Sequence, residues 1–390
     1  MQIIIWGADN YNTLGLLRQL ANSELQVCFA NTGRKQLCAS ASKYCTQYVE
    51  IPINTEGLQY LIKLVSSLSG RPVLIPAGDA TAEFVDQNKK QLLNYFILSG
   101  TVEQGLLTKV DDKNVMSELA RRHKFNVPYS IPYTTETIVP DDFIFPAVLK
   151  PVITSNGVNE FKYRVINDIE SLNHFKHYLN PANTYILQQF IPKTNDILIY
   201  GVRLTGGEVF LAGRYIKDRW SDDGGGSHGR IVVDIPVEFN LNGIKSFLEE
   251  IDYHGLFSVE YGLSNEIPWF YEFNLRNDAT SHLFYQAGAN LPLKWCYDCL
   301  GITKSVSTAV EGEHWNINEI YDITNVFKGH ISYAEYRRQR RQANVFHYFD
   351  AIDKRPYKIV RSKALFDVPF RMLLKPLRPY LAWMIRKLKQ

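Results

Sequence analysis

The sequence is poor in the features that mark secreted and membrane-spanning proteins. Its 390 residues include five cysteines, an odd number spread thinly, which indicates a reducing compartment. No run reaches the roughly 18 apolar residues that a transmembrane helix needs. The start, MQIIIWGADN, has no basic n-region and is a first strand rather than a signal peptide. With 45% hydrophobic and 21% charged residues, the composition predicts a cytoplasmic globular protein.

Several catalytic and cofactor motifs are also missing. Gly7 and Gly15 are eight residues apart, so the GxGxxG fingerprint of a dinucleotide site is absent. Cys296 and Cys299 have the spacing of half a zinc site, but no second Cys or His pair follows, so we expect two thiols on one side of a helix. We find no Ser-His-Asp or Cys-His set for nucleophilic catalysis.

Residues 1 to about 100 alternate strand and helix patterns and predict a βαβ domain with a parallel sheet. Asp79 follows one of these strands, where open sheets place ligands. The same residue can instead be a helix N-cap, and this second interpretation is the one we favour.

The most informative segment is GLFSVEYGLSNEIPWFYEFNLRN, which predicts a β-hairpin by its alternation of apolar and polar residues. If its loop covers residues 264–268, centred on Glu266, then Glu260 and Glu272 lie directly opposite each other. Opposed carboxylates repel unless a positive charge lies between them. A surface hairpin with solvated acids is the simpler alternative, but the segments upstream favour a divalent cation.

Oxygen ligands suit a hard ion such as Mg²⁺, with Mn²⁺ as the alternative, so we predict a metal site at Glu260, Glu272 and Asn274. Arg276, two residues further on the same face, would direct a fork of donors at an anion that the metal holds.

The order of the upstream segments completes a pattern. Asp112 and Lys113 open an amphipathic helix, a strand ends at Lys150, and the sequences TSNG and YILQQFIPKTND precede the hairpin. This order resembles the ATP-grasp family, the ligase fold of biotin carboxylase and D-alanine–D-alanine ligase, over roughly residues 1–300. The resemblance implies a ligase that uses ATP and Mg²⁺ to join a carboxylate to an amine through an acyl phosphate.

The resemblance also implies roles for individual residues. Lys113 and Lys150 would bind the nucleotide phosphates, Asp196 the ribose hydroxyls, and Arg276 would act in catalysis on the transferring phosphoryl group. The hinge that contacts adenine would consist of Gln188, Gln189, Phe190 and Ile191. Two departures stand out. The loop at residues 154–157 has one glycine where the family has several, and the two glutamines carry no charge.

The expected fold class is mixed α/β and α+β in three parts. These are an N-terminal domain (residues 1–100), an ATP-grasp domain (residues 101–300, with lobes at about 107–185 and 186–300) and a basic C-terminal extension (residues 301–390). Residues 222–230 are rich in glycine and predict either a disordered hairpin tip or a lid carrying His228 and Arg230. On the two strands before them, at least one of Arg203, Arg214 and Lys217 is expected to face the triphosphate.

The last sixty residues differ in charge from the rest. Residues 331–390 carry a net +11 within a chain of +3, which leaves −8 on the first 330. Apolar residues at helical spacing within 364–390, with basic residues between them, predict either helix packing on the body or peripheral contact with the inner face of an anionic membrane. We expect no nucleic-acid partner, because the body is acidic.

Three function classes follow. The first is the ATP-dependent carboxylate–amine ligase, acting on an amino acid or a sugar acid in envelope glycan or peptide synthesis. The second is a non-catalytic nucleotide-binding module, which the loop at residues 154–157 suggests because it has only one glycine. The third is a nicotinamide-dependent oxidoreductase, which rests on the N-terminal βαβ pattern alone.

Overall fold

The structure is a computed structural model that describes residues 1–21, 23–152, 161, 163–221 and 224–374. The N-terminal part is a parallel sheet, as predicted, and its strand order is β3-β2-β1-β4-β5. Its central strands are buried on both faces because helices cover each side. The strands are β1 (Ile3–Gly7), β2 (Val27–Asn31), β3 (Gln47–Glu50), β4 (Val73–Pro76) and β5 (Ile97–Leu98). The helices are α1 (Tyr11–Leu20), the short 3-10 turn η1 (Ala39–Ala41), α2 (Thr55–Val65), α3 (Asp79–Gln87) and α4 (Lys89–Leu92).

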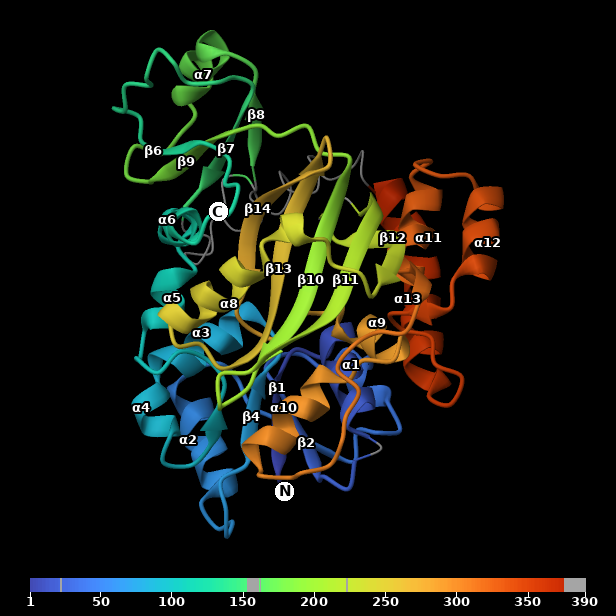
Figure 1. The fold of residues 1–390 in the computed structure, drawn as a ribbon. Coiled ribbons are helices and arrows are strands. Elements are labelled where there is room, and N and C mark those ends of the chain that lie inside the picture. Colours follow the sequence, from blue (N-terminus) through green and yellow to red (C-terminus); the bar gives the residue numbers. More distant parts are fainter. Residues whose placement is uncertain (22, 153–160, 162, 222–223, 375–390) are drawn as a thin grey trace, which may run out of the picture.

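A small antiparallel sheet follows, in the order β6-β9-β7-β8, and forms a separate lobe (Figure 1). Its core includes Tyr133, Leu149 and Tyr185, all nearly fully buried. The strands are β6 (Ser130–Tyr133), β7 (Ala147–Pro151), β8 (Arg164–Ile166) and β9 (Tyr185–Gln189). The helices before and within this lobe are α5 (Leu106–Val110), α6 (Lys113–Arg122) and α7 (Ile169–Lys176).

The largest sheet lies at the centre of the molecule, in the order β14-β13-β10-β11-β12-β15-β16 (Figure 1). One face of this sheet packs on α6 and α8. The other face shares a hydrophobic core with α1 of the N-terminal domain and with α10. Its strands are β10 (Asn195–Arg203), β11 (Val209–Trp220), β12 (Gly226–Val232), β13 (Gly255–Ser264), β14 (Ile267–Asn274), β15 (Glu313–Ile317) and β16 (Val345–Phe346). The helical segments around it are η2 (Val237–Phe239), α8 (Leu241–Glu250), α9 (Ser281–Gln286), α10 (Leu291–Cys299), α11 (Glu319–Phe327), α12 (Tyr333–Gln342) and α13 (Lys354–Leu374).

The structure differs from the sequence-based expectation after residue 300. Instead of beginning a separate extension, this part of the chain adds β15 and β16 to the large sheet. The glycine-rich segment differs too. Residues 226–230 lie in β12, paired on both sides by β11 and β15, so His228 and Arg230 are strand residues and not parts of a lid.

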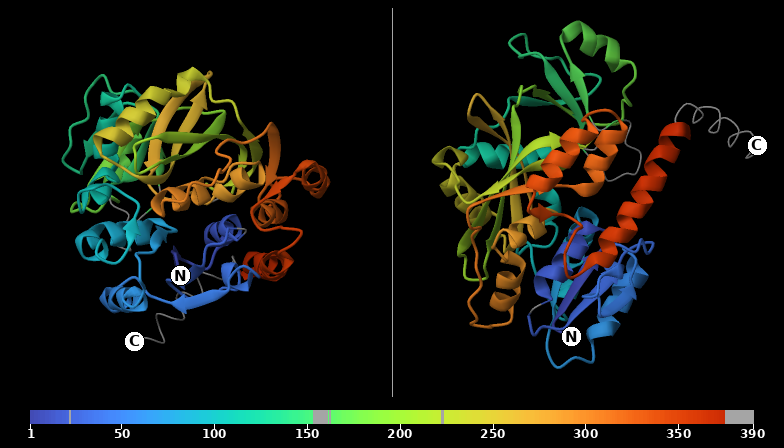
Figure 2. Two further views of the ribbon diagram at one scale, coloured as in Figure 1. Left: turned by 60° about the horizontal axis from the view of Figure 1, so that its bottom comes forward. Right: turned by 90° about the vertical axis from the view of Figure 1, so that its right-hand side faces the viewer.

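The chain continues into α13, which runs beside the N-terminal domain (Figure 2). Lys363 donates a hydrogen bond to the carbonyl of Gln36 there, and Ala364 is buried. The predicted membrane segment, residues 364–390, lies for the most part outside the described residues. Within the part of the chain that the structure describes, no helix is long and apolar enough to cross a bilayer.

Candidate active site

The hairpin of β13 and β14 has the predicted register, with Glu260 opposite Glu272, but the turn is shorter than expected. It consists of Asn265 and Glu266, both with positive φ (49° and 62°), as in a two-residue type I′ turn. Without interruption, this turn would place Tyr271 opposite Glu260. A β-bulge at Tyr271 adds the missing residue and restores the pairing of the two glutamates.

The two glutamates lie in different environments. Glu260 accepts a hydrogen bond from the Lys217 ammonium group (3.3 Å) and one from the Asn274 amide nitrogen (3.4 Å). Glu272 accepts no hydrogen bond from any described residue and is solvent-exposed in a cleft that protein surrounds on most sides. Burial and the neighbouring charge of Glu260 raise the pKa of Glu272.

This arrangement fits a cation. Glu272 is an ionisable group without a partner among the described residues, and its carboxylate repels that of Glu260. A metal held by Glu260, Glu272 and Asn274 would remove this repulsion. The described residues contain no group of three His, Cys, Asp or Glu side chains at metal-binding distances, so an amide or a substrate oxygen has to complete the ligand set.

Arg276 lies at the edge of this set. Its guanidinium donates to the Asn274 side-chain oxygen (3.1 Å) and forms an ion pair with Asp79 from α3. The charges of Asp79 and Asp278 raise the pKa of Arg276 although burial lowers it, so the group is cationic. Our N-cap assignment for Asp79 is wrong, since Gly78 occupies the cap position and Asp79 reaches across the cleft.

The two predicted phosphate lysines face the same cleft. Lys150, in β7, donates to the Gln188 side-chain oxygen (3.0 Å), and Lys113, at the start of α6, donates to the Pro151 carbonyl (3.4 Å). Burial and the nearby charge of Lys113 lower the pKa of Lys150 to about 8, against the opposing effect of Glu272. Asp112 and Lys113 open a helix, as predicted, and the Asp112 carboxylate caps it by accepting hydrogen bonds from the amides of Asn114 and Val115.

The remaining predicted residues lie at the end of β9, in the segment that follows it, and at the start of β10. Gln188 and Gln189 end β9, and the segment leads through Phe190 and Ile191 towards β10. Asp196, the predicted ribose residue, already accepts hydrogen bonds from the Lys193 ammonium group and from the Trp220 indole. The loop at residues 154–157 lies outside the described residues.

Sequence reasoning did not choose among the three candidate cations, and it did not identify some neighbours of the site. Of the three candidate cations on the strands, Lys217 reaches Glu260. Arg203 binds the Tyr253 carbonyl instead, and Arg214 pairs with Asp234. The alternation of side chains along the strand could have identified Lys217. It lies two residues from the core residue Tyr215 and therefore on the same face of the strand. The neighbours Lys193, Trp220 and Asp111 carried no such signal, since they meet the site only through the tertiary fold.

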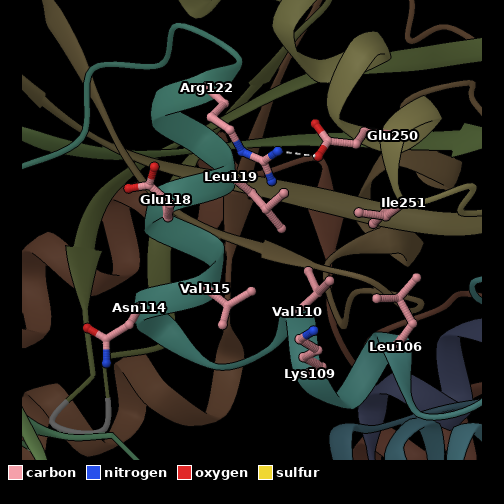
Figure 3. A pocket seen from close by; sticks show the side chains of 10 residues that line it. All are labelled: Leu106, Lys109, Val110, Asn114, Val115, Glu118, Leu119, Arg122, Glu250 and Ile251. Carbon is pink, nitrogen blue, oxygen red and sulfur yellow. Dashed lines mark ion pairs between the residues drawn. The ribbon is translucent and has the colours of Figure 1, made fainter.

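A cavity of about 470 Å³ lies between α5, α6 and α8 (Figure 3). Its lining is mainly apolar and includes the Arg122–Glu250 ion pair (2.7 Å). None of the predicted site residues lines it, so the cavity is separate from the cleft of the glutamates.

The fold is similar to that of several solved enzymes. The N5-carboxyaminoimidazole ribonucleotide synthetase of Thermus thermophilus superposes with a TM-score of 0.61 at 16% identity, over 80% of this chain and 82% of that chain. Biotin carboxylase of Campylobacter jejuni gives 0.63 at 13% identity, over 80% of this chain and 74% of that chain. An L-amino acid ligase of Bacillus licheniformis gives 0.58 at 13% identity, over 77% and 74%. The chain therefore has the fold of these enzymes, the ATP-grasp fold.

One relative is similar to this chain in sequence. The chain is 25% identical to the D-aspartate ligase of Enterococcus faecium (strain Aus0004) over 330 residues, which cover 74% of each protein. No protein-family model matches the chain.

Proposed function

We propose that this chain uses ATP and Mg²⁺ to activate the carboxylate of an amino acid, and that it joins this carboxylate to an amine. The observation that carries the proposal is the meeting of five charged side chains in one cleft from separate parts of the chain. Lys113, Lys150 and Arg276 all act electrostatically on Glu272, which lies opposite Glu260. Such an arrangement supplies what phosphoryl transfer needs, namely positioning and neutralisation of negative charge.

The proposed roles follow from position. Glu260, Glu272 and Asn274 hold Mg²⁺, which neutralises phosphate charge when bound. Lys113 and Lys150 bind the phosphates, while residues 188–191 form the wall of the adenine site. Arg276 lies beside the metal residues, where it can stabilise the charge that develops on the transferring phosphoryl group.

The relatives support an amino acid as the carboxylate. One is named a D-aspartate ligase and another an L-amino acid ligase. We keep a sugar acid as the second choice, since an acceptor linked to the cell envelope would suit the basic C-terminal segment.

The oxidoreductase alternative conflicts with the first helix. A pyrophosphate would need the free amides at the start of α1, but the Asn10 side chain already accepts hydrogen bonds from the amides of Asn12 and Thr13. Gly15, the second glycine, packs against His282 instead of facing a ligand.

The test is a matrix of carboxylates and amines assayed for ADP and phosphate release. The carboxylates are D-aspartate, the L-amino acids and uronic acids, and the amines are amino acids and hydroxylamine. We expect phosphate release only in wells that contain both a carboxylate and an amine. Binding of ATP without turnover in any well would support the non-catalytic module and contradict the ligase.

A further inference from the structure

Two helices near the C-terminal end carry a basic surface that the proposed active site does not use. α12 and α13 lie on the same side of the molecule (Figure 1). Their described side chains belong to residues 333–342 and 354–366, which include nine lysines and arginines but only one acid, Glu335. Six of these cations are exposed and form no ion pair or hydrogen bond with any described residue. We call them the basic surface: Arg337, Arg341, Lys354, Arg355, Lys358 and Arg361.

The two helices hold these cations in fixed positions. On α13, Lys354, Lys358 and Arg361 are four and three residues apart, so they lie along one face of the helix. Arg340 joins the helices, because its guanidinium carbon, from α12, lies 5.8 Å from the centre of the Tyr357 ring in α13. The basic surface therefore extends over both helices.

The fold also fixes α13 on the body with its cationic face outward. Asp353, directly before α13, forms a buried ion pair with Arg18 of α1 (3.1 Å). Further along, Lys363 donates a hydrogen bond to the Gln36 carbonyl. The cations are thus presented by a helix that is already docked, and a partner need not fold this part of the chain in order to bind it.

Large apolar side chains are exposed beside the cations. Tyr333 is 62% exposed, Ile352 71% and Phe366 77%. Phe366 lies eleven residues after Arg355, which is about three helical turns, so the two share a face of α13. A soluble acidic polymer would satisfy the cations alone. An anionic bilayer pairs with the cations through its headgroups and takes up the apolar side chains at its interface.

We propose that the basic surface binds the anionic headgroups of a lipid bilayer, with Ile352 and Phe366 entering the interface. The inference does not depend on the ligase chemistry. The sequence continues from α13 into residues 375–390, which contain five lysines and arginines and no acid. The surface and these residues act together, since each basic residue near an anionic bilayer adds to the attraction.

The test measures co-sedimentation of the full-length protein with vesicles at low and high salt. One kind of vesicle contains phosphatidylcholine alone, and the other contains equal amounts of phosphatidylcholine and phosphatidylglycerol. We expect binding only to the anionic vesicles. The triple variant Arg341→Gln, Lys354→Gln, Lys358→Gln should weaken this binding by about 100-fold at low salt. Phe366→Ser should weaken it by about tenfold at either salt concentration, because salt does not screen apolar insertion.

Two matched controls remove the same groups elsewhere. The triple variant Lys63→Gln, Lys90→Gln, Lys245→Gln removes three exposed cations from other helices, and Tyr178→Ser removes an exposed aromatic side chain from the small lobe. Both controls should bind like the wild type, and the melting temperature should be the same in every variant.

Equal binding by the two triple variants would overturn the proposal, and so would a wild-type protein that does not bind anionic vesicles at low salt. If the wild type binds soluble polyglutamate but no vesicles, the basic surface takes an acidic polymer and the bilayer proposal is wrong.

Discussion

At the scale of single residues, the account depends on the charge of Glu272. Its carboxylate faces Glu260 without a partner among the described residues, so its ionisation costs stability when no metal is bound. We predict that Glu272→Gln lowers ATP turnover by roughly 100-fold or more, because a metal ligand is lost. The melting temperature without metal should stay the same or rise, since the repulsion is relieved.

Glu266→Gln, which changes an exposed carboxylate in the turn of the same hairpin, is the control for this measurement. A Glu272→Gln enzyme that turns over ATP at the normal rate and normal Mg²⁺ concentration would refute the metal assignment.

Lys150 should bind the nucleotide only while it is charged. We predict that Lys150→Ala weakens ATP binding by roughly 10-fold to 100-fold and that Lys113→Ala weakens it less. Since the pKa of Lys150 is lowered to about 8, wild-type affinity for ATP should fall as the pH rises through this value. Lys150→Arg, which stays charged, should flatten that dependence.

Titration calorimetry at pH 7 and pH 9 measures these differences. Unchanged ATP affinity in both alanine variants would show that the lysines do not contact the phosphates.

Arg276 is expected to act mainly in the transition state. Arg276→Lys keeps the charge but loses the fork that joins Asp79 and Asn274. We predict a fall in kcat of roughly 100-fold or more with nearly unchanged nucleotide affinity. Arg214→Lys, in an ion pair outside the cleft, serves as the control. Full activity in Arg276→Lys would reduce Arg276 to a structural residue.

At the scale of elements, the hairpin shows how far the sequence could predict the site. Alternation of apolar and polar residues gave the right pairing of Glu260 with Glu272, but from a five-residue loop. The actual structure combines a two-residue turn with a bulge at Tyr271, and the two differences cancel in the register. A bulge leaves little signal in a single sequence, because it depends on what packs across the strand, here Tyr271 over Gly262.

The turn itself gives a prediction about stability. Glu266 adopts φ 62°, which costs energy for a residue with a Cβ atom. We expect Glu266→Gly to stabilise the protein by about 0.5 to 1 kcal/mol in urea denaturation without changing activity. Asn265→Gly should gain less, since asparagine tolerates this conformation. Destabilisation by Glu266→Gly would contradict the assigned type of turn.

At the scale of the whole molecule, the sequence predicted the parts whose patterns are local. The parallel sheet of residues 1–98 follows from regular alternation of strand and helix patterns. The sequence did not predict β15 and β16. Both strands are short, and they pair with strands that are distant in the sequence. Charge composition pointed to a separate basic extension, but net charge describes a surface and not a fold. The ion pair of Asp79 with Arg276, 197 residues apart, likewise has no local signature.

The C-terminal segment can be divided by this structure. α13 packs on the body through Pro356 and Ala364, so a deletion that starts at Lys354 should lower the melting temperature. We predict that deletion of residues 375–390 leaves melting temperature and turnover unchanged but abolishes co-sedimentation with vesicles rich in anionic lipid. High salt should release the full-length protein only in part, because it screens charge but not apolar insertion. A large loss of stability in the shorter deletion would show that this segment is part of the core.

The central claim is that ATP activates a carboxylate as an acyl phosphate in the cleft of Glu260 and Glu272. Transfer of isotope tests it most directly, using D-aspartate or another accepted carboxylate labelled with ¹⁸O in its reacting carboxyl group. When the amine displaces phosphate from the acyl phosphate, the bridging oxygen leaves with the phosphate. The account predicts one ¹⁸O atom in each phosphate released along with amide, and loss of this product in Glu272→Gln. Phosphate without ¹⁸O, released from ATP by water alone, would contradict it.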